Sequence, residues 1–220
     1  MYIEPCCAER QLGQLFRENK GHAVLMQTSG DMLLKHWMQA IMLLVGDRPR
    51  TLTLAVPVFT DKMMDIVAKY LRLEWVANFK LLTTDQIPAE ILQQFADKVG
   101  CSAKALMERI EVAADSAIPN ELIAFSGPEG TVVVQGSIID TVTPGMTLHA
   151  GVMGKTEGNG VRSVMDAWGA HFRLRKYEVT FAIVEPAVEA AGTGAASGTE
   201  SAPTKQQSKK PRKQQKPKKV

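Results

Sequence analysis

Along most of this 220-residue chain, short runs of branched apolar residues alternate with segments whose apolar residues recur at helical spacing. Residues 22–27, 51–59 and 79–83 are typical of strands, and residues 31–45 and 61–71 between them are typical of helices. Strands joined by helices form right-handed crossovers that cover both faces of a sheet. The order therefore predicts an α/β fold with a mixed, largely parallel sheet and helices on both faces, followed by a disordered C-terminal tail.

The second half of the chain has a different pattern. Residues 122–125 and 131–135 flank the turn sequence SGPEG, which is a β-hairpin signal and adds mixed pairing to the sheet. We expect a further strand over residues 148–153, a helix over residues 161–171 and a last alternating strand over residues 177–184.

Composition divides the chain into four segments. Residues 1–19 are expected to form an N-terminal helical segment, and residues 20–185 the α/β domain. Residues 186–204 are small and polar, which is typical of a flexible linker. Residues 205–220, rich in Lys, Gln and Pro, cannot bury enough apolar surface to offset the entropy lost on ordering, so we expect a disordered basic arm.

The basic arm contains no acid. Its eight cations are Lys205, Lys209, Lys210, Arg212, Lys213, Lys216, Lys218 and Lys219. The whole chain has a formal charge of +3, so removing these eight cations leaves −5 on residues 1–204. Dense positive charge releases counterions from a polyanion, and the arm therefore predicts binding to DNA or RNA without sequence preference. A solubilising tail or a nuclear localisation signal would have the same composition.

The cysteines and the termini exclude several classes of protein. Cys6, Cys7 and Cys101 form neither a CxxC pair nor a spacing suited to zinc, so we expect reduced thiols, no metal and no cofactor. The N-terminal residues carry charges where a signal peptide requires an apolar core, and the longest apolar run, residues 40–45, is far shorter than a membrane span. We expect no membrane partner and a cytoplasmic location, or a nuclear one in a eukaryote.

Residues 149–156, HAGVMGKT, resemble the phosphate-binding P-loop motif G-x-x-x-x-G-K-[ST]. Gly154, Lys155 and Thr156 match the motif, but His149 occupies the position of its first glycine. Two glycines within the next four residues would break the helix that holds the phosphates in such loops. A strand that ends in a flexible loop is the preferred interpretation.

Residues 92–110, LQQFADKVGCSAKALMERI, have the spacing of a helix-turn-helix unit and resemble those of bacterial repressors. The second helix would present Lys104 and Arg109 to DNA, and these two residues are candidate secondary contacts for nucleic acid. Glu108 beside them would repel phosphates. A plain helical hairpin inside an α/β fold accounts for the same pattern.

The hairpin segment 121–140, ELIAFSGPEGTVVVQGSIID, resembles the second strand pair of the phospholipase D superfamily, whose motif runs H-x-K-x4-D-x6-G-S-x-N. When Gly136 and Ser137 are placed on the Gly-Ser of the motif, the other positions are taken by Leu122 at the His, Ala124 at the Lys, Glu129 at the acid and Ile139 at the Asn. The strand and helix order of residues 20–185 also resembles that of the single-domain members.

In that family the His attacks phosphorus, while the Lys and the Asn hold the phosphate oxygens. The resemblance therefore implies a phosphodiesterase fold in which this half-site is degenerate, because Leu122 cannot attack and Ala124 carries no charge. Since the family pairs two half-sites, the resemblance also implies a homodimer.

Three functions are compatible with these observations. The leading hypothesis is a non-enzymatic protein that binds nucleic acid through its basic arm, with no residue assigned a catalytic role. The first alternative is a phosphodiesterase or nuclease-type enzyme whose site the sequence does not identify. The second is a structural or assembly module of a phage or mobile element.

Overall fold

The computed structural model describes residues 2–19, 22–29, 32–118, 120–136, 146–154, 159–179 and 181. The linker 186–204 and the basic arm 205–220 lie outside the described residues. The strands are β1 (Tyr2–Ile3), β2 (Ala23–Ser29), β3 (Thr51–Ala55), β4 (Asn78–Thr83), β5 (Ile110–Ala114), β6 (Leu122–Gly127), β7 (Gly130–Gly136) and β8 (Met146–Gly154). The helices are η1 (Pro5–Cys7), α1 (Ala8–Glu18), α2 (Leu34–Met42), α3 (Asp61–Arg72), α4 (Ala89–Val99), α5 (Ala103–Met107) and α6 (Asn159–Arg175).

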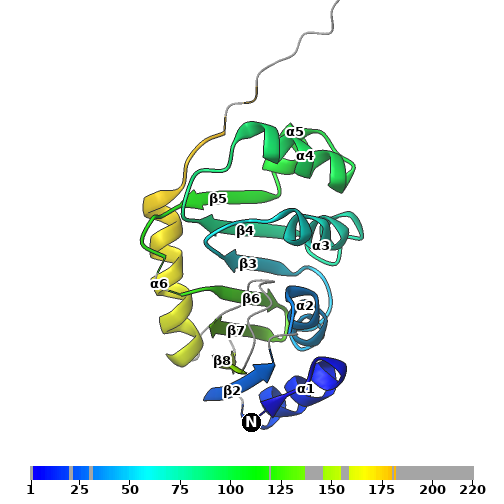
Figure 1. The fold of residues 1–220 in the computed structure, drawn as a ribbon, viewed down its shortest axis with the longest axis vertical. Helices are drawn as coiled ribbons and strands as arrows, with labels where there is room; N and C mark the ends of the chain where they lie inside the picture. The colour runs from blue at the N-terminus through cyan, green and yellow to red at the C-terminus, as the bar shows by residue number, and fades with distance from the viewer. Residues whose placement is uncertain are drawn as a thin grey trace, which may run out of the picture. The chain divides into compact units, whose positions relative to one another are not determined.

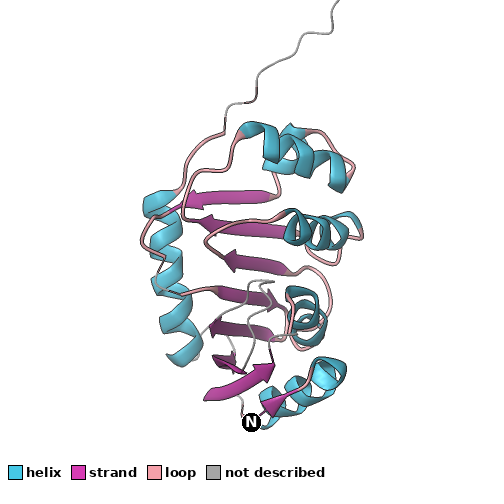
Figure 2. Cartoon of the chain, viewed as in Figure 1, coloured by secondary structure: helices cyan, strands magenta, loops and turns pink. Residues whose placement is uncertain are grey.

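The described strands form one eight-stranded sheet in the order β1-β2-β8-β7-β6-β3-β4-β5, which confirms the predicted mixed α/β fold (Figure 2). Three of its pairings are parallel and four are antiparallel. The expectation of a largely parallel sheet was wrong, because β2 pairs with β8 and not with β3. The two-residue turn between β6 and β7 permits only antiparallel pairing, and these late strands separate the two parallel parts of the sheet.

Helices cover both faces of the sheet, as predicted. Helices α1 to α5 lie on one face and α6 lies on the other (Figure 1). The larger apolar core packs the first face and includes Leu52, Phe79 and Phe125 from the strands. A smaller apolar cluster packs α6, through Trp168 and Phe172, against the opposite side chains of the same strands.

The expected strand over residues 177–184 is not present among the described residues of that segment. Helix α6 continues past the expected end at residue 171 to Arg175, so the chain reaches the edge of the sheet only at Lys176, which forms an isolated bridge with Ala113 of β5. The next residue is fixed by its side chain, since the Tyr177 hydroxyl accepts a hydrogen bond of 2.8 Å from the Ile87 amide.

Residues 2–19 are part of the same compact unit as the sheet, which spans residues 1–182. Strand β1 pairs in parallel with β2, the strand that follows α1, and Ile3 lies opposite Thr28. Helix α1 buries Leu12 and Phe16 in the larger core. The N-terminal segment thereby extends the sheet by one edge strand.

Candidate phosphate-binding groove

A cavity of about 410 Å³ lies between the sheet and the C-terminal half of α6. Its polar and charged lining consists of the hydroxyls of Thr51, Thr53 and Ser126, the cations Lys80, Arg173 and Lys176, and the carboxylate of Glu111. Met165, Trp168 and Phe172 of α6 supply its apolar wall. We call this cavity the α6 groove.

The floor of the α6 groove follows from the alternation of side chains along the strands. Thr51 and Thr53 project from β3 to the same face as Ala55, which packs in the α6 cluster. In the sheet register Thr53 lies opposite Lys80, and Thr51 lies opposite Ser126. The face covered by α6 is therefore polar at the amino end of β3 and apolar at its carboxyl end.

Thr53 places a hydroxyl group at the base of the groove, on a residue that is only 4% exposed. Nearby, the Thr131 hydroxyl donates to the Ser126 oxygen at 3.0 Å. Because a hydroxyl can both donate and accept a hydrogen bond, a ligand in the groove could be contacted by Thr53 and Ser126.

The charges in the groove favour an anion. Lys80 Nζ lies 3.5 Å from Glu111 Oε2, while Arg173 is exposed on the last turn of α6 and Lys176 is exposed directly after the helix ends. Three cations and one carboxylate leave a local excess of positive charge in a body of net charge −5. Arg175, on the same turn, is engaged elsewhere, since its Nε lies 3.4 Å from the Asp115 carboxylate.

Gly169 keeps the helix side of the groove open. A Cβ atom at this position would lie 3.5 Å from Arg173 Nη1, so a longer side chain would occupy the space in front of that guanidinium. Glycine inside a helix costs about 1 kcal/mol relative to alanine. Gly169 therefore lowers the stability of the helix but leaves the Arg173 guanidinium accessible from the groove.

The groove continues into a second cavity of about 510 Å³ at the amino ends of β4 and β5. The two cavities share Thr51, Lys80, Glu111 and Lys176. Arg109, one of the two candidate secondary contacts, lines this second cavity.

The Arg109 guanidinium is occupied by hydrogen bonds within the protein. It donates to the carbonyl oxygens of Leu71 at 2.9 Å, Val76 at 3.0 Å and Ala77 at 3.3 Å. These bonds hold the loop between α3 and β4 against the start of β5. Arg109 therefore has a structural task in addition to its position beside the groove.

Lys104, the other candidate contact, is exposed on α5. Helix α5 has only five residues and is capped by Ser102, whose Oγ accepts a hydrogen bond from the Ala105 amide at 3.2 Å. Gly100, with φ of +84°, ends α4 before it. The α4–α5 pair is a helical hairpin with a second helix of less than two turns, which is short for a reading helix in the major groove.

The positions that resemble phospholipase D lie in the β6–β7 hairpin. Leu122 and Ala124 are 0% and 1% exposed and belong to the apolar cluster under α6. The Glu129 amide in the turn donates to the Val45 carbonyl at 3.0 Å. Ser137 and Ile139 lie outside the described residues. Leu122 and Ala124 are therefore core residues.

The first part of the segment that resembles a P-loop forms a strand. His149 and Gly154 belong to β8, which pairs with both β2 and β7, while Lys155 and Thr156 lie outside the described residues. The eight cations of the basic arm also lie outside the described residues, so the predicted role of the arm stays a prediction.

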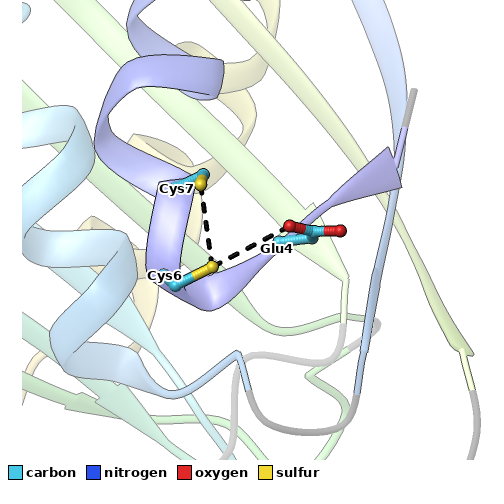
Figure 3. Close-up of side chains that lie close together, drawn as sticks. All are labelled: Glu4, Cys6 and Cys7. Carbon is cyan, nitrogen blue, oxygen red and sulfur yellow. Dashed lines mark hydrogen bonds between the residues drawn. The ribbon is translucent and has the colours of Figure 1, made fainter.

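Away from the groove, the structure brings together the side chains of Glu4, Cys6 and Cys7 (Figure 3). The sequence patterns did not identify this cluster. A hydrogen bond and the electrostatic interaction with Cys7 raise the pKa of the Cys6 thiol, and desolvation and the Glu4 carboxylate add to this effect. The signal that could have indicated the cluster is Pro5, which favours a tight turn at the first helical position and so brings residues i, i+2 and i+3 together.

In the part of the chain that the structure describes, no helix is long and apolar enough to cross a membrane.

Comparison with known proteins identifies no family for this chain. No family model matches the sequence, and no curated protein matches it either. Among solved structures, the chain is similar to TrmBL2, described as an archaeal chromatin protein with a novel mode of DNA binding, with a TM-score of 0.42 and 12% sequence identity. The similarity covers 77% of this chain and 60% of that chain, which is less than two thirds of the length of TrmBL2.

Proposed function

We propose that this protein binds nucleic acid without sequence preference, using its Lys-rich arm as the main contact and the α6 groove as a phosphate-binding site on the folded body. The observation that carries the proposal is the distribution of charge. Eight cations without an acid follow a body of net charge −5, and within that body three further cations converge on one groove. Phosphate contacts of this kind give affinity that depends on charge density and not on base sequence.

The lining of the groove supports a phosphate in particular. Charged donors come from Lys80, Arg173 and Lys176, and neutral donors come from Thr53 and the other hydroxyls. An arginine can bind a phosphate through two parallel hydrogen bonds, and lysine contributes a point charge. An intracellular location, which three free cysteines predict, accords with a nucleic-acid partner.

The groove is tested by a charge-matched pair of triple variants of the full chain. One variant carries Lys80→Gln, Arg173→Gln and Lys176→Gln. The control carries Lys62→Gln, Lys69→Gln and Arg72→Gln, which are exposed on α3 on the opposite face of the sheet. Both variants lose two lysines and one arginine, so a general effect of net charge is the same in each.

Binding is measured by the fluorescence anisotropy of a labelled DNA duplex at several salt concentrations. The groove variant should bind more weakly and should lower the slope of log affinity against log salt by up to about 3, since each neutralised phosphate contributes about 0.9. The control should retain the slope of the wild type within about 1. Equal losses in the two variants would show that the groove is not a specific contact.

We further propose that the domain is a degenerate relative of the phospholipase D superfamily, without phosphohistidine chemistry, and that it forms a homodimer. The burial of Leu122 and Ala124 in the α6 cluster supports the loss of that chemistry. Light scattering of the purified chain tests the dimer, and a monomer at all concentrations would count against this relationship.

A further inference from the structure

Glu4, Cys6 and Cys7 bring three potential metal ligands together at the N-terminal turn. The Cys6 and Cys7 sulfur atoms are 3.6 Å apart, and the Cys6 sulfur lies 3.8 Å from Glu4 Oε2. All three ligand atoms lie within 4.8 Å of one another. Figure 3 shows the Cys6 sulfur between the Cys7 sulfur and a Glu4 carboxylate oxygen, with a dashed line to each.

Two of these distances are close to the edges of a tetrahedral zinc site. With Zn–S bonds of about 2.3 Å and a Zn–O bond of about 2.0 Å, a tetrahedron places two sulfurs about 3.8 Å apart and a sulfur and an oxygen about 3.5 Å apart. The separations of the Cys6 sulfur from the Cys7 sulfur and from the Glu4 oxygen differ from these edges by a few tenths of an ångström. The Cys7 sulfur and the Glu4 carboxylate lie within 4.8 Å of each other, so side-chain rotations that bring these two groups together would let one ion contact all three.

The backbone that carries the ligands is held in place. Pro5 begins η1, the Cys7 amide donates to the Glu4 carbonyl at 3.0 Å, and the Glu4 amide donates to Gln11 Oε1 at 2.9 Å. The buried side chains of Ile3 and Ala8 anchor the turn on either side. A site on a fixed element loses little entropy when it binds an ion.

The ligand types select the ion. Two thiolates and a carboxylate suit Zn²⁺ and disfavour Mg²⁺ and Ca²⁺, which prefer oxygen ligands. Cys6 is exposed, and both cysteines line an open hollow of about 690 Å³ between α1 and α2, which provides an entry path. We propose that Glu4, Cys6 and Cys7 bind one zinc ion and leave its fourth coordination position to water.

Binding releases the two thiol protons to solvent and involves no change of oxidation state. Water in the fourth position is the arrangement of zinc sites that exchange ligands or perform catalysis, whereas structural sites are usually closed by a fourth protein ligand. The site does not depend on the proposed nucleic-acid function, because it lies at the opposite end of the sequence from the basic arm and uses none of the residues of the α6 groove.

The test is a titration of the full chain with Co²⁺, which reports tetrahedral thiolate coordination by absorbance, in the presence of a phosphine reductant. We expect one Co²⁺ per chain with thiolate charge-transfer and visible bands, and displacement of the Co²⁺ by Zn²⁺. Cys6→Ser and Cys7→Ser should each abolish the charge-transfer band, and Glu4→Gln should weaken binding by about 10-fold or more. Cys101→Ser is the matched control and should leave the titration unchanged.

Three results would overturn the proposal. The first is no stoichiometric Co²⁺ band in the reduced wild type. The second is a band that survives both Cys6→Ser and Cys7→Ser or is lost in Cys101→Ser. The third is mass spectrometry of the protein isolated without added reductant showing a disulfide between Cys6 and Cys7. Circular dichroism of each variant confirms that a lost band does not reflect unfolding.

Discussion

Replacing Arg109 with alanine should destabilise the fold by about 3 kcal/mol. The guanidinium makes two well-formed hydrogen bonds, to the carbonyls of Leu71 at 2.9 Å and Val76 at 3.0 Å, and a longer one to Ala77 at 3.3 Å. A hydrogen bond from a charged donor contributes about 1.5 to 3 kcal/mol. Counting the two short bonds at the lower end of that range gives the stated loss, since water can reach part of the freed loop.

Urea unfolding monitored by circular dichroism measures this loss, and Lys104→Ala provides the control. Lys104 is exposed on the neighbouring helix, so its substitution should change the unfolding free energy by less than about 0.5 kcal/mol. Arg109→Lys should recover only part of the stability, because one ammonium cannot reproduce the planar fork of donors. A loss below about 1 kcal/mol in Arg109→Ala would refute the structural role and return Arg109 to the candidate contacts for nucleic acid.

Three further predictions follow from the core. Burial raises the pKa of Tyr70 to about 12, so the neutral phenol is favoured in the folded state. The unfolding free energy should then be maintained up to about pH 10 and fall by about 2 kcal/mol by pH 12, with a smaller fall in Tyr70→Phe, as measured by urea unfolding across this range. Gly127→Ala should lower stability by about 2 kcal/mol or more in thermal unfolding, because a Cβ atom there would lie 2.3 Å from the Val45 carbonyl oxygen. The purified chain should not cleave a chromogenic phosphodiester by a phosphohistidine route, because Leu122 and Ala124 are buried apolar residues, and turnover that substitutions around Gly136 and Ser137 abolish would contradict this.

The alternation of strands and helices was readable from the sequence, but the order of the strands was not. Many of the helices and strands have a local signal, such as the Thr60 side chain that accepts a hydrogen bond from the Met63 amide at the start of α3. The pairing of β2 with β8 joins residues more than a hundred positions apart, and no local pattern encodes it. The parallel share of the sheet was therefore overestimated.

The α6 groove could not be predicted for a related reason. Thr51 and Thr53 are β-branched, so they fit a strand equally well beside a core or beside a cavity. Their role depends on where α6 crosses the sheet and on the convergence of Lys80 and Lys176 from distant elements. The cluster of Glu4, Cys6 and Cys7 was missed for a similar reason. Zinc motifs are recognised in a sequence by the spacing of their ligands, and two adjacent cysteines do not have such a spacing. The turn that begins at Pro5 brings them close to Glu4, and this contact is visible only in the structure.

The central claim, that the chain holds nucleic acid mainly through its arm, is tested most directly by the salt dependence of duplex DNA binding with and without residues 205–219. Deletion should remove most of the affinity, because residues 1–204 carry a net charge of −5. The slope of log affinity against log salt should fall in magnitude by up to about 7, as expected for eight cations at about 0.9 per neutralised phosphate. An arm scrambled at fixed composition should bind as the wild type does. Equal affinity and equal slope in the full and truncated chains would contradict the claim and make the folded domain the reader of nucleic acid.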